Sequence, residues 1–163
     1  MSIPTAVRHY FIGALELPSE LLDELLTGLK VGDPIWDFKP YPERFSLKWA
    51  LAHFADWNDI FRARLEKTRD EEFPTLPDAD EGQIAIDRDY ENSNPVETLA
   101  KFKSSRRDLI EMINGLSETD WDRRAVKIGA GDLSISEHIS LIMAHDDYHM
   151  RQIIDYRRRF ADR

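Results

Sequence analysis

The chain has 163 residues, of which 42% are apolar and 33% are charged, and its formal net charge is −9. This size and composition predict one soluble globular domain over residues 1–163, and the acidic balance excludes a general nucleic-acid binder, which needs a concentrated basic surface. The absence of cysteine excludes disulfides, thiolate metal sites and cysteine nucleophiles together. No signal peptide and no apolar run of membrane-spanning length are visible, so we expect a cytoplasmic protein without a membrane partner.

Helical periodicity predicts four long helices, which in chain order cover about residues 5–29, 46–70, 95–114 and 134–160. Pro18 falls inside the first helix and predicts a kink or an interruption there. Ser46 is the expected N-cap of the second helix, and Asn94 that of the third. Ser134 and Glu137 have the spacing of a capping box at the start of the fourth helix.

The connections between these helices are long and rich in proline. They cover residues 31–45 and 71–94, and the second connection contains a weaker helical pattern over 79–90. In segment 126–135 a strand is conceivable, but Gly129 and Gly131 favour a loop. Four long amphipathic helices with such connections predict an all-α fold, a four-helix bundle with long inter-helix loops.

The inward face of the last helix turns from apolar to polar halfway along its length. Its residues at helical spacing are Ile135, His138, Ile142, His145, His149, Gln152 and Tyr156. A buried polar group without a partner costs roughly 1–3 kcal/mol, so two histidines on adjacent turns require a shared reason. The four-residue spacing places the Cβ atoms of His145 and His149 about 6 Å apart on one face. Both imidazoles can therefore ligate one metal ion.

The second helix offers a third imidazole, His53, which lies on the flank of its apolar face. If the two helices are neighbours in the bundle, His53 can meet His145 and His149. Three neutral imidazoles with an open fourth position are the ligand set of a catalytic zinc site. Imidazole also suits nickel, iron and copper, so the ligands predict a divalent metal site without naming the ion.

Two other interpretations of these histidines remain open. A single histidine in a helix is more often structural or half-exposed, and we expect His9 to be structural or on the surface. His138 lies about 10 Å from His145 along the helix axis, too far to ligate the same ion. The segment from His145 through Asp146 to His149 is also close to the zinc-protease motif, in which the acid is the general base. Aspartate is shorter than the usual glutamate and no third ligand follows, so a zincin-like hydrolase is the weaker alternative.

Two segments resemble the DinB-like (YfiT/DinB) superfamily of metalloenzymes. They are "FSLKWALAHFADWNDIFRARL" and "SISEHISLIMAHDDYHMRQI". The first matches the family pattern H-[LF]-x-[DE]-W-[EN] at His53, and the second matches H-[ED]-x-x-H-x-x-Q-[IL] at His145 and His149. The resemblance implies a four-helix bundle in which these three histidines hold one divalent metal, with zinc, nickel, iron and manganese as alternatives.

The resemblance also implies a type of chemistry. Characterised relatives include S-transferases that use bacillithiol or mycothiol and proteins similar to maleylpyruvate isomerase, in which the metal lowers the pKa of the thiol. A thiol supplied as a co-substrate agrees with a chain that has no cysteine. We therefore expect a metal-dependent enzyme acting on a small-molecule substrate, first a thiol S-transferase and otherwise an isomerase or hydrolase. The alternative is a non-catalytic, stress-related bundle that binds metal or ligand, and a homodimer is expected in either case.

Five further residues are candidates for supporting roles. Asp56 and Asp146 are the candidate catalytic residues, and we expect Asp56 to be exposed enough to orient substrate or water, with an ordinary surface charge as the alternative. The candidate substrate-binding residues are Trp57, His138 and Gln152. For Trp57, packing against the core is the more common role of a tryptophan at helical spacing.

Overall fold

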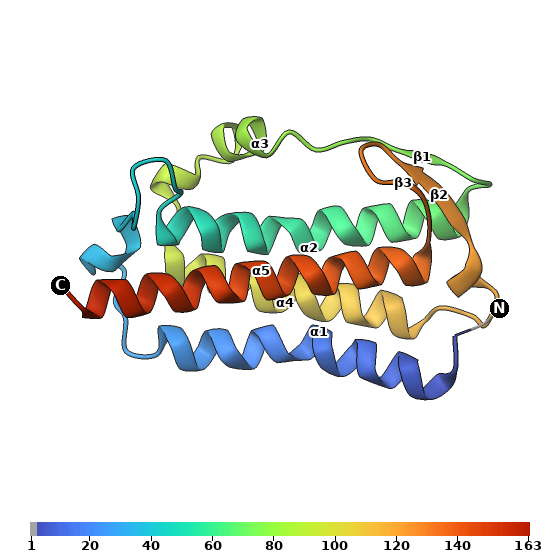
Figure 1. Ribbon diagram of the computed structural model, residues 1–163, viewed down its shortest axis with the longest axis horizontal. Coiled ribbons are helices and arrows are strands. Elements are labelled where there is room, and N and C mark those ends of the chain that lie inside the picture. The colour runs from blue at the N-terminus through green and yellow to red at the C-terminus, as the bar shows by residue number, and fades with distance from the viewer. Residues whose placement is uncertain (1–2) are drawn as a thin grey trace.

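The computed structural model describes residues 3–163, and it confirms the four-helix bundle (Figure 1). The long helices are α1 (Thr5–Leu26), α2 (Leu47–Asp70), α4 (Pro95–Asn114) and α5 (Ile135–Ala161). Shorter helical segments are α3 (Glu81–Asp87) and the 3₁₀ turns η1 (Pro34–Asp37), η2 (Tyr90–Asn92) and η3 (Asp120–Asp122). The helix predicted within 79–90 is α3. Over residues 3–163, no helix is long and apolar enough to cross a membrane.

The ends of the helices follow from local side-chain chemistry. Ser46 and Asn94 accept hydrogen bonds from backbone N–H groups of the first turns of α2 and α4, and the capping box of Ser134 and Glu137 opens α5. Helix α1 ends three residues earlier than predicted, because Gly28 adopts a φ of 80°, a conformation that stops a helix. The predicted interruption at Pro18 is wrong, since α1 continues through it.

The order of the helices around the bundle brings α2 and α5 together. Helix α2 packs against α4 and α5, and α1 packs against the same two helices. Helices α1 and α5 run in one direction and α2 and α4 in the other (Figure 1). Helix α4 can run parallel to α2 because the 71–94 connection, which includes α3, returns along the length of the bundle. The contact between α2 and α5 is the one that the metal hypothesis requires.

A small sheet at one end of the bundle corrects the prediction of a loop over 126–135. Strand β2 (Arg124–Lys127) pairs antiparallel with β3 (Gly131–Ser134) and parallel with the two-residue strand β1 (Thr75–Leu76). Gly129 and Gly131 have positive φ, so they allow the turn of the hairpin rather than prevent the strands. The pairing with β1 comes from a segment about 50 residues away, which local sequence does not show.

Most of the described interior lies in two apolar clusters, and a small third cluster includes Ala85 and Tyr90. One large cluster includes Leu15, Phe61, Leu109 and Ile142, and the other includes Leu22, Phe54, Phe102 and Met150. Buried polar side chains lie near the junction of the two large clusters. They include His53, Asp56, Asn58, Ser105, Arg106, Asp146 and His149. The fold therefore places its polar groups at mid-length of the bundle.

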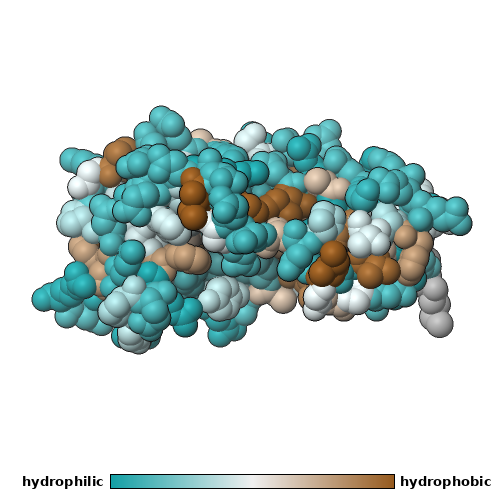
Figure 2. All heavy atoms as spheres, turned by 90° about the horizontal axis from the view of Figure 1, so that it is seen from above, coloured by the Kyte–Doolittle hydropathy of each residue, from teal (hydrophilic) through white to brown (hydrophobic). Residues whose placement is uncertain are grey.

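The outer surface near α3 and the 71–94 connection is mainly hydrophilic. Figure 2 shows this face from above the view of Figure 1, with apolar side chains in a few separate groups. A mainly hydrophilic surface agrees with a chain in which one third of the residues are charged. The large apolar side chains gather instead in the two interior clusters, where removal from water stabilises the fold.

Candidate metal centre

The structure brings together His53 of α2 and His145 and His149 of α5. One ring nitrogen of each lies within 4.8 Å of the others, and Nε2 of His53 is 3.3 Å from Nε2 of His145. The ring centroid of His149 is 4.7 Å from that of His53 and 4.3 Å from that of His145. His53 and His149 are buried, and His145 is partly exposed. The three rings thus converge on one point at the edge of the bundle interior.

The spacing of two of these nitrogens fits a shared tetrahedral ion. Two imidazole nitrogens, each about 2.05 Å from a metal and separated by the tetrahedral angle, are about 3.3 Å from each other. The observed Nε2–Nε2 distance of 3.3 Å between His53 and His145 equals this value. Two ring nitrogens at this distance without an ion would need one of them to carry a hydrogen toward the other. The donor set is therefore suited to a divalent first-row metal.

Burial keeps His53 and His149 in the neutral form that binds metals. It lowers the pKa of His53 to about 4, with a further contribution from His145. It lowers the pKa of His149 to about 3, with smaller contributions from His145 and His53. At neutral pH both rings are uncharged, so each has one nitrogen lone pair available for a cation.

A chain of hydrogen bonds sets which nitrogen of His149 has that lone pair. The hydroxyl of Tyr156 donates to the backbone carbonyl of Phe45 at 2.8 Å, so it must accept from Nε2 of Gln152, at 3.2 Å. The other end of that amide, Oε1, then lies 2.9 Å from Nδ1 of His149 and can only accept. Nδ1 therefore carries the proton, and Nε2 of His149 faces the other two rings with its lone pair.

A cavity of about 360 Å³ opens over the three rings. Its wall contains the three histidines and residues from the loop before α2, from α3 and from α5; these further residues are Glu43, Arg44, Phe45, Glu81, Tyr148 and Gln152. A second cavity of about 300 Å³ shares Arg44, Tyr148 and Gln152 with the first. The volume over the rings suits a small molecule.

Comparison with known proteins identifies the family of this chain. The family model described as the DinB superfamily matches residues 14–153, which include all three histidines. The chain belongs to the DinB superfamily. No curated protein matches the sequence of this DinB superfamily member.

A solved structure has the same fold as this DinB superfamily member. It is YfiT from Bacillus subtilis, described as "a probable metal-dependent hydrolase with an unusual four-helix bundle topology". The two chains superpose with a TM-score of 0.87 at 18% sequence identity, over 98% of this chain and 91% of YfiT. At this identity the likeness extends to the fold alone.

Asp146, a candidate catalytic residue, does not face the cavity in this DinB superfamily member. It is 3% exposed and both of its carboxylate oxygens bind the guanidinium of Arg106 from α4, one of them at 2.8 Å. An oxygen of Asp146 lies 4.0 Å from Nδ1 of His145, beyond hydrogen-bond distance. The structure therefore gives no support to Asp146 as a catalytic residue, or as the general base of the weaker zincin-like alternative, because a buried cation holds its carboxylate.

Asp56, the other candidate catalytic residue, is also buried, at 3% exposure, and the expectation that it is exposed is wrong. It accepts hydrogen bonds from Tyr90 at 2.7 Å and from Lys101, and Arg88 lies 2.7 Å away. Burial opposes ionisation of Asp56, but Lys101 and Tyr90 outweigh it and lower its pKa. Three residues after His53, Asp56 is turned toward α4 and η2 rather than toward α5.

The three candidate substrate-binding residues have different surroundings. Trp57 stacks on His53 with ring centroids 4.2 Å apart, so it packs behind a proposed ligand and is absent from the cavity wall. His138 is buried against Phe61 and is also absent from that wall. Gln152 does line the cavity, and it also orients His149. His9 is exposed, as expected for a histidine outside the site.

Sequence reasoning missed the largest buried cation. Arg106 is 1% exposed, and besides Asp146 it binds Oδ1 of Asn58 at 2.9 Å and the backbone carbonyl of Leu15 at 3.1 Å. It thus joins all four long helices beside the histidines. A signal was present, because Arg106 occupies a core position between Phe102 and Leu109 on the apolar face of its helix.

Proposed function

We propose that His53, His145 and His149 bind one divalent cation and that the chain is a metal-dependent enzyme acting on a small molecule. The observation that carries the proposal is the 3.3 Å separation of two imidazole nitrogens, the edge length of a tetrahedral metal site. The hydrogen bond from His149 to Gln152 supports it, because ligating histidines commonly donate their second N–H to a fixed acceptor. Zinc, nickel, iron and manganese are the ions that we propose to test.

A thiol co-substrate is the first choice of nucleophile. When bound, a divalent ion supplies Lewis-acid chemistry that lowers the pKa of a thiol or of water. A thiol, with an ordinary pKa of about 8.5, needs far less of this help than water at about 15.7. The two buried aspartates beside the histidines are held by Arg106 and by Lys101, so neither is free to take a proton from water. We therefore infer S-transfer or thiol-dependent isomerisation.

The protein's own residues would hold and enclose the reactants. Gln152 keeps the lone pair of His149 directed at the metal position, and Trp57 supports His53 from behind. The cavity of about 360 Å³ receives the thiol and a small electrophile. Arg44, Glu43 and Glu81 line this cavity and can contact a substrate.

Metal-dependent hydrolysis is the second candidate, and the description of YfiT favours it. This reaction needs a base for water. Of the residues that line the cavity, Glu43 and Glu81 are the carboxylates able to take that part. Loss of hydrolysis in Glu81→Gln or Glu43→Gln, with thiol-independent turnover in the parent, would select this candidate.

The first experiment measures metal content. Protein purified from metal-replete medium should contain about one divalent ion per chain by mass spectrometry. His149→Gln should lose it. His138→Gln is the matched control, because it makes the same substitution at a buried histidine of the same helix outside the cluster. A folded parent without metal, or equal metal content in both variants, would refute the site.

The second experiment separates an enzyme from a binding protein. The loaded protein is assayed with bacillithiol, mycothiol and glutathione against chlorinated and epoxide electrophiles. Turnover that requires both thiol and metal supports the transferase. A protein that holds metal tightly but turns over neither these substrates nor simple esters and amides supports the non-catalytic alternative.

A further inference from the structure

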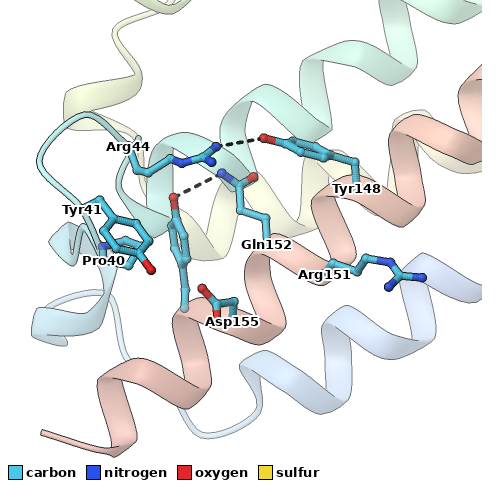
Figure 3. A pocket seen from close by; sticks show the side chains of 8 residues that line it. Pro40, Tyr41, Arg44, Tyr148, Arg151, Gln152 and Asp155 are labelled. Carbon is cyan, nitrogen blue, oxygen red and sulfur yellow. Dashed lines mark hydrogen bonds between the residues drawn. The ribbon is translucent and has the colours of Figure 1, made fainter.

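Arg44 lies at the boundary between the two cavities. It lines both of them, together with Tyr148 and Gln152 (Figure 3). Its Nη1 donates to the hydroxyl of Tyr148 at 3.1 Å, across the space between the loop before α2 and helix α5. A group bound to Arg44 would therefore lie next to the cavity over the histidines.

Within residues 3–163 Arg44 forms no salt bridge, although Glu43 is close enough to interact with its charge. Its one hydrogen-bond partner there is the neutral Tyr148. Other arginines of this region are already neutralised, since Arg151 binds Asp147 at 2.9 Å and Arg158 binds Asp155 at 2.9 Å. A guanidinium has five N–H donors in a planar fork that matches a carboxylate. Arg44 therefore has donors available for a ligand.

The loop that carries Arg44 is fixed in place over the site. The carbonyl of Phe45 accepts from Tyr156 at 2.8 Å, and the ring of Phe45 stacks on Trp49 with centroids 5.3 Å apart. Ser46 then caps α2. Because the residues directly after Arg44 are held by α2 and α5, the backbone of Arg44 is positioned before any ligand arrives, and the hydrogen bond to Tyr148 directs its guanidinium. Such preorganisation reduces the entropy lost on binding.

The charges around the cavity over the histidines favour a ligand with one negative charge. Glu43 and Glu81 line the same cavity as Arg44, and the three side chains together are singly negative. With neutral imidazoles, a divalent ion would make the site singly positive. A monoanion balances that charge, whereas a dianion such as a phosphate ester would exceed it and meet repulsion from the two glutamates.

We propose that this site selects small monocarboxylic acids and that Arg44 binds their carboxylate, displacing the hydroxyl of Tyr148. The carboxylate site rests on the proposed function, because the reacting group of the acid would lie over the metal centre. The second cavity, lined by Pro40, Tyr41 and Tyr156, offers apolar surface to the remainder of the acid.

The test compares matched inert probes on zinc-loaded protein by ligand-observed NMR titration. Phenylacetate should bind about tenfold more tightly than its neutral amide, phenylacetamide, and more tightly than phenyl phosphate. Arg44→Gln should weaken phenylacetate about tenfold and leave the amide unchanged, and Arg44→Lys should retain part of the preference. Arg158→Gln is the control, because Arg158 is paired with Asp155 and lies outside both cavities.

The proposal is overturned if acid and amide bind equally, if neither binds, or if Arg44→Gln retains the preference for the acid. Tighter binding of phenyl phosphate overturns the carboxylate class. Loss of phenylacetate binding in His149→Gln alone would place the carboxylate on the metal instead of on Arg44. Metal content is measured on the same samples. A preference that depends on Arg44 in a chain without metal would refute the proposed function and leave the carboxylate site standing.

Discussion

The buried pair of Arg106 and Asp146 should make one of the largest single contributions to the stability of the bundle. The two side chains are 1% and 3% exposed, and they bind each other through two hydrogen bonds between α4 and α5. Asp146 directly follows His145 in the sequence. The pair therefore also determines how far along its axis α5 sits, and with it the position of two histidines.

The expected free-energy changes follow from burial. Removing one partner leaves the other charge in the interior, so Arg106→Met and Asp146→Leu should each cost about 3–5 kcal/mol of unfolding free energy. The double variant has no unpaired charge and should cost about as much as one single variant. The coupling energy is then about 3–5 kcal/mol, a large share of the roughly 5–15 kcal/mol that stabilises a domain.

Urea unfolding of the metal-free protein at pH 7 measures all four members of the cycle. The matched control is the pair of Asp147 and Arg151, which lies on the same helix but is exposed at 62% and 78% of its side chains. For the same substitutions there, we expect a coupling too small to resolve, because water screens the charges. A buried pair that couples no more strongly than this exposed pair would refute the reasoning.

Three further predictions concern the metal centre and the stability of α5. Gln152→Leu should weaken zinc binding by roughly 10–100-fold in chelator competition, because Gln152 accepts the hydrogen bond of His149. Tyr156→Phe should weaken it by less, because Tyr156 only orients the amide of Gln152. Unchanged zinc affinity in both variants would contradict the assigned tautomer of His149. Burial lowers the pKa of His138 from 6.5 to about 4. As the pH drops from 6.5 toward 4, the unfolded chain binds a proton at His138 before the folded chain does, so the free energy of unfolding should fall. Between pH 7 and 4.5 this loss is about 2 kcal/mol in urea titrations, and His138→Leu should lack it. Equal losses in the parent and in His138→Leu would place the titration at another residue. Ser134→Ala should cost about 1 kcal/mol in thermal unfolding, because it removes the capping box of α5, whereas exposed Ser140→Ala should cost less.

The helices were predictable because their signals are local. Apolar spacing and the caps at Ser46, Asn94 and Ser134 depend on residues within a few turns, so they gave helix starts that agree with the structure. The strands of the hairpin were not predictable in this way. Their pairing with β1 joins segments about 50 residues apart, and glycine is compatible with a loop and with a hairpin turn alike.

The candidate site was likewise predictable only where its signals are local. The periodicity of the last helix placed His145 and His149 on one inward face, and the second helix offered His53, so the imidazole cluster could be predicted. The roles of the aspartates could not. Asp56 and Asp146 have the helical spacing of residues beside the histidines, but each is bound by a cation from another helix, Lys101 or Arg106.

The sequence by itself determined the helices, their caps and the three inward histidines, because each depends on the period of one helix and on side chains within a turn or two. The tertiary structure alone decided which groups face the cavity. Packing of α4 against α2 directed Lys101 onto Asp56 and let Arg106 reach across the interior to Asp146 of α5, and the loop before α2 placed Arg44 beside the histidines. Burial of a charge requires a partner, and that partner comes from whichever helix the fold places next to it.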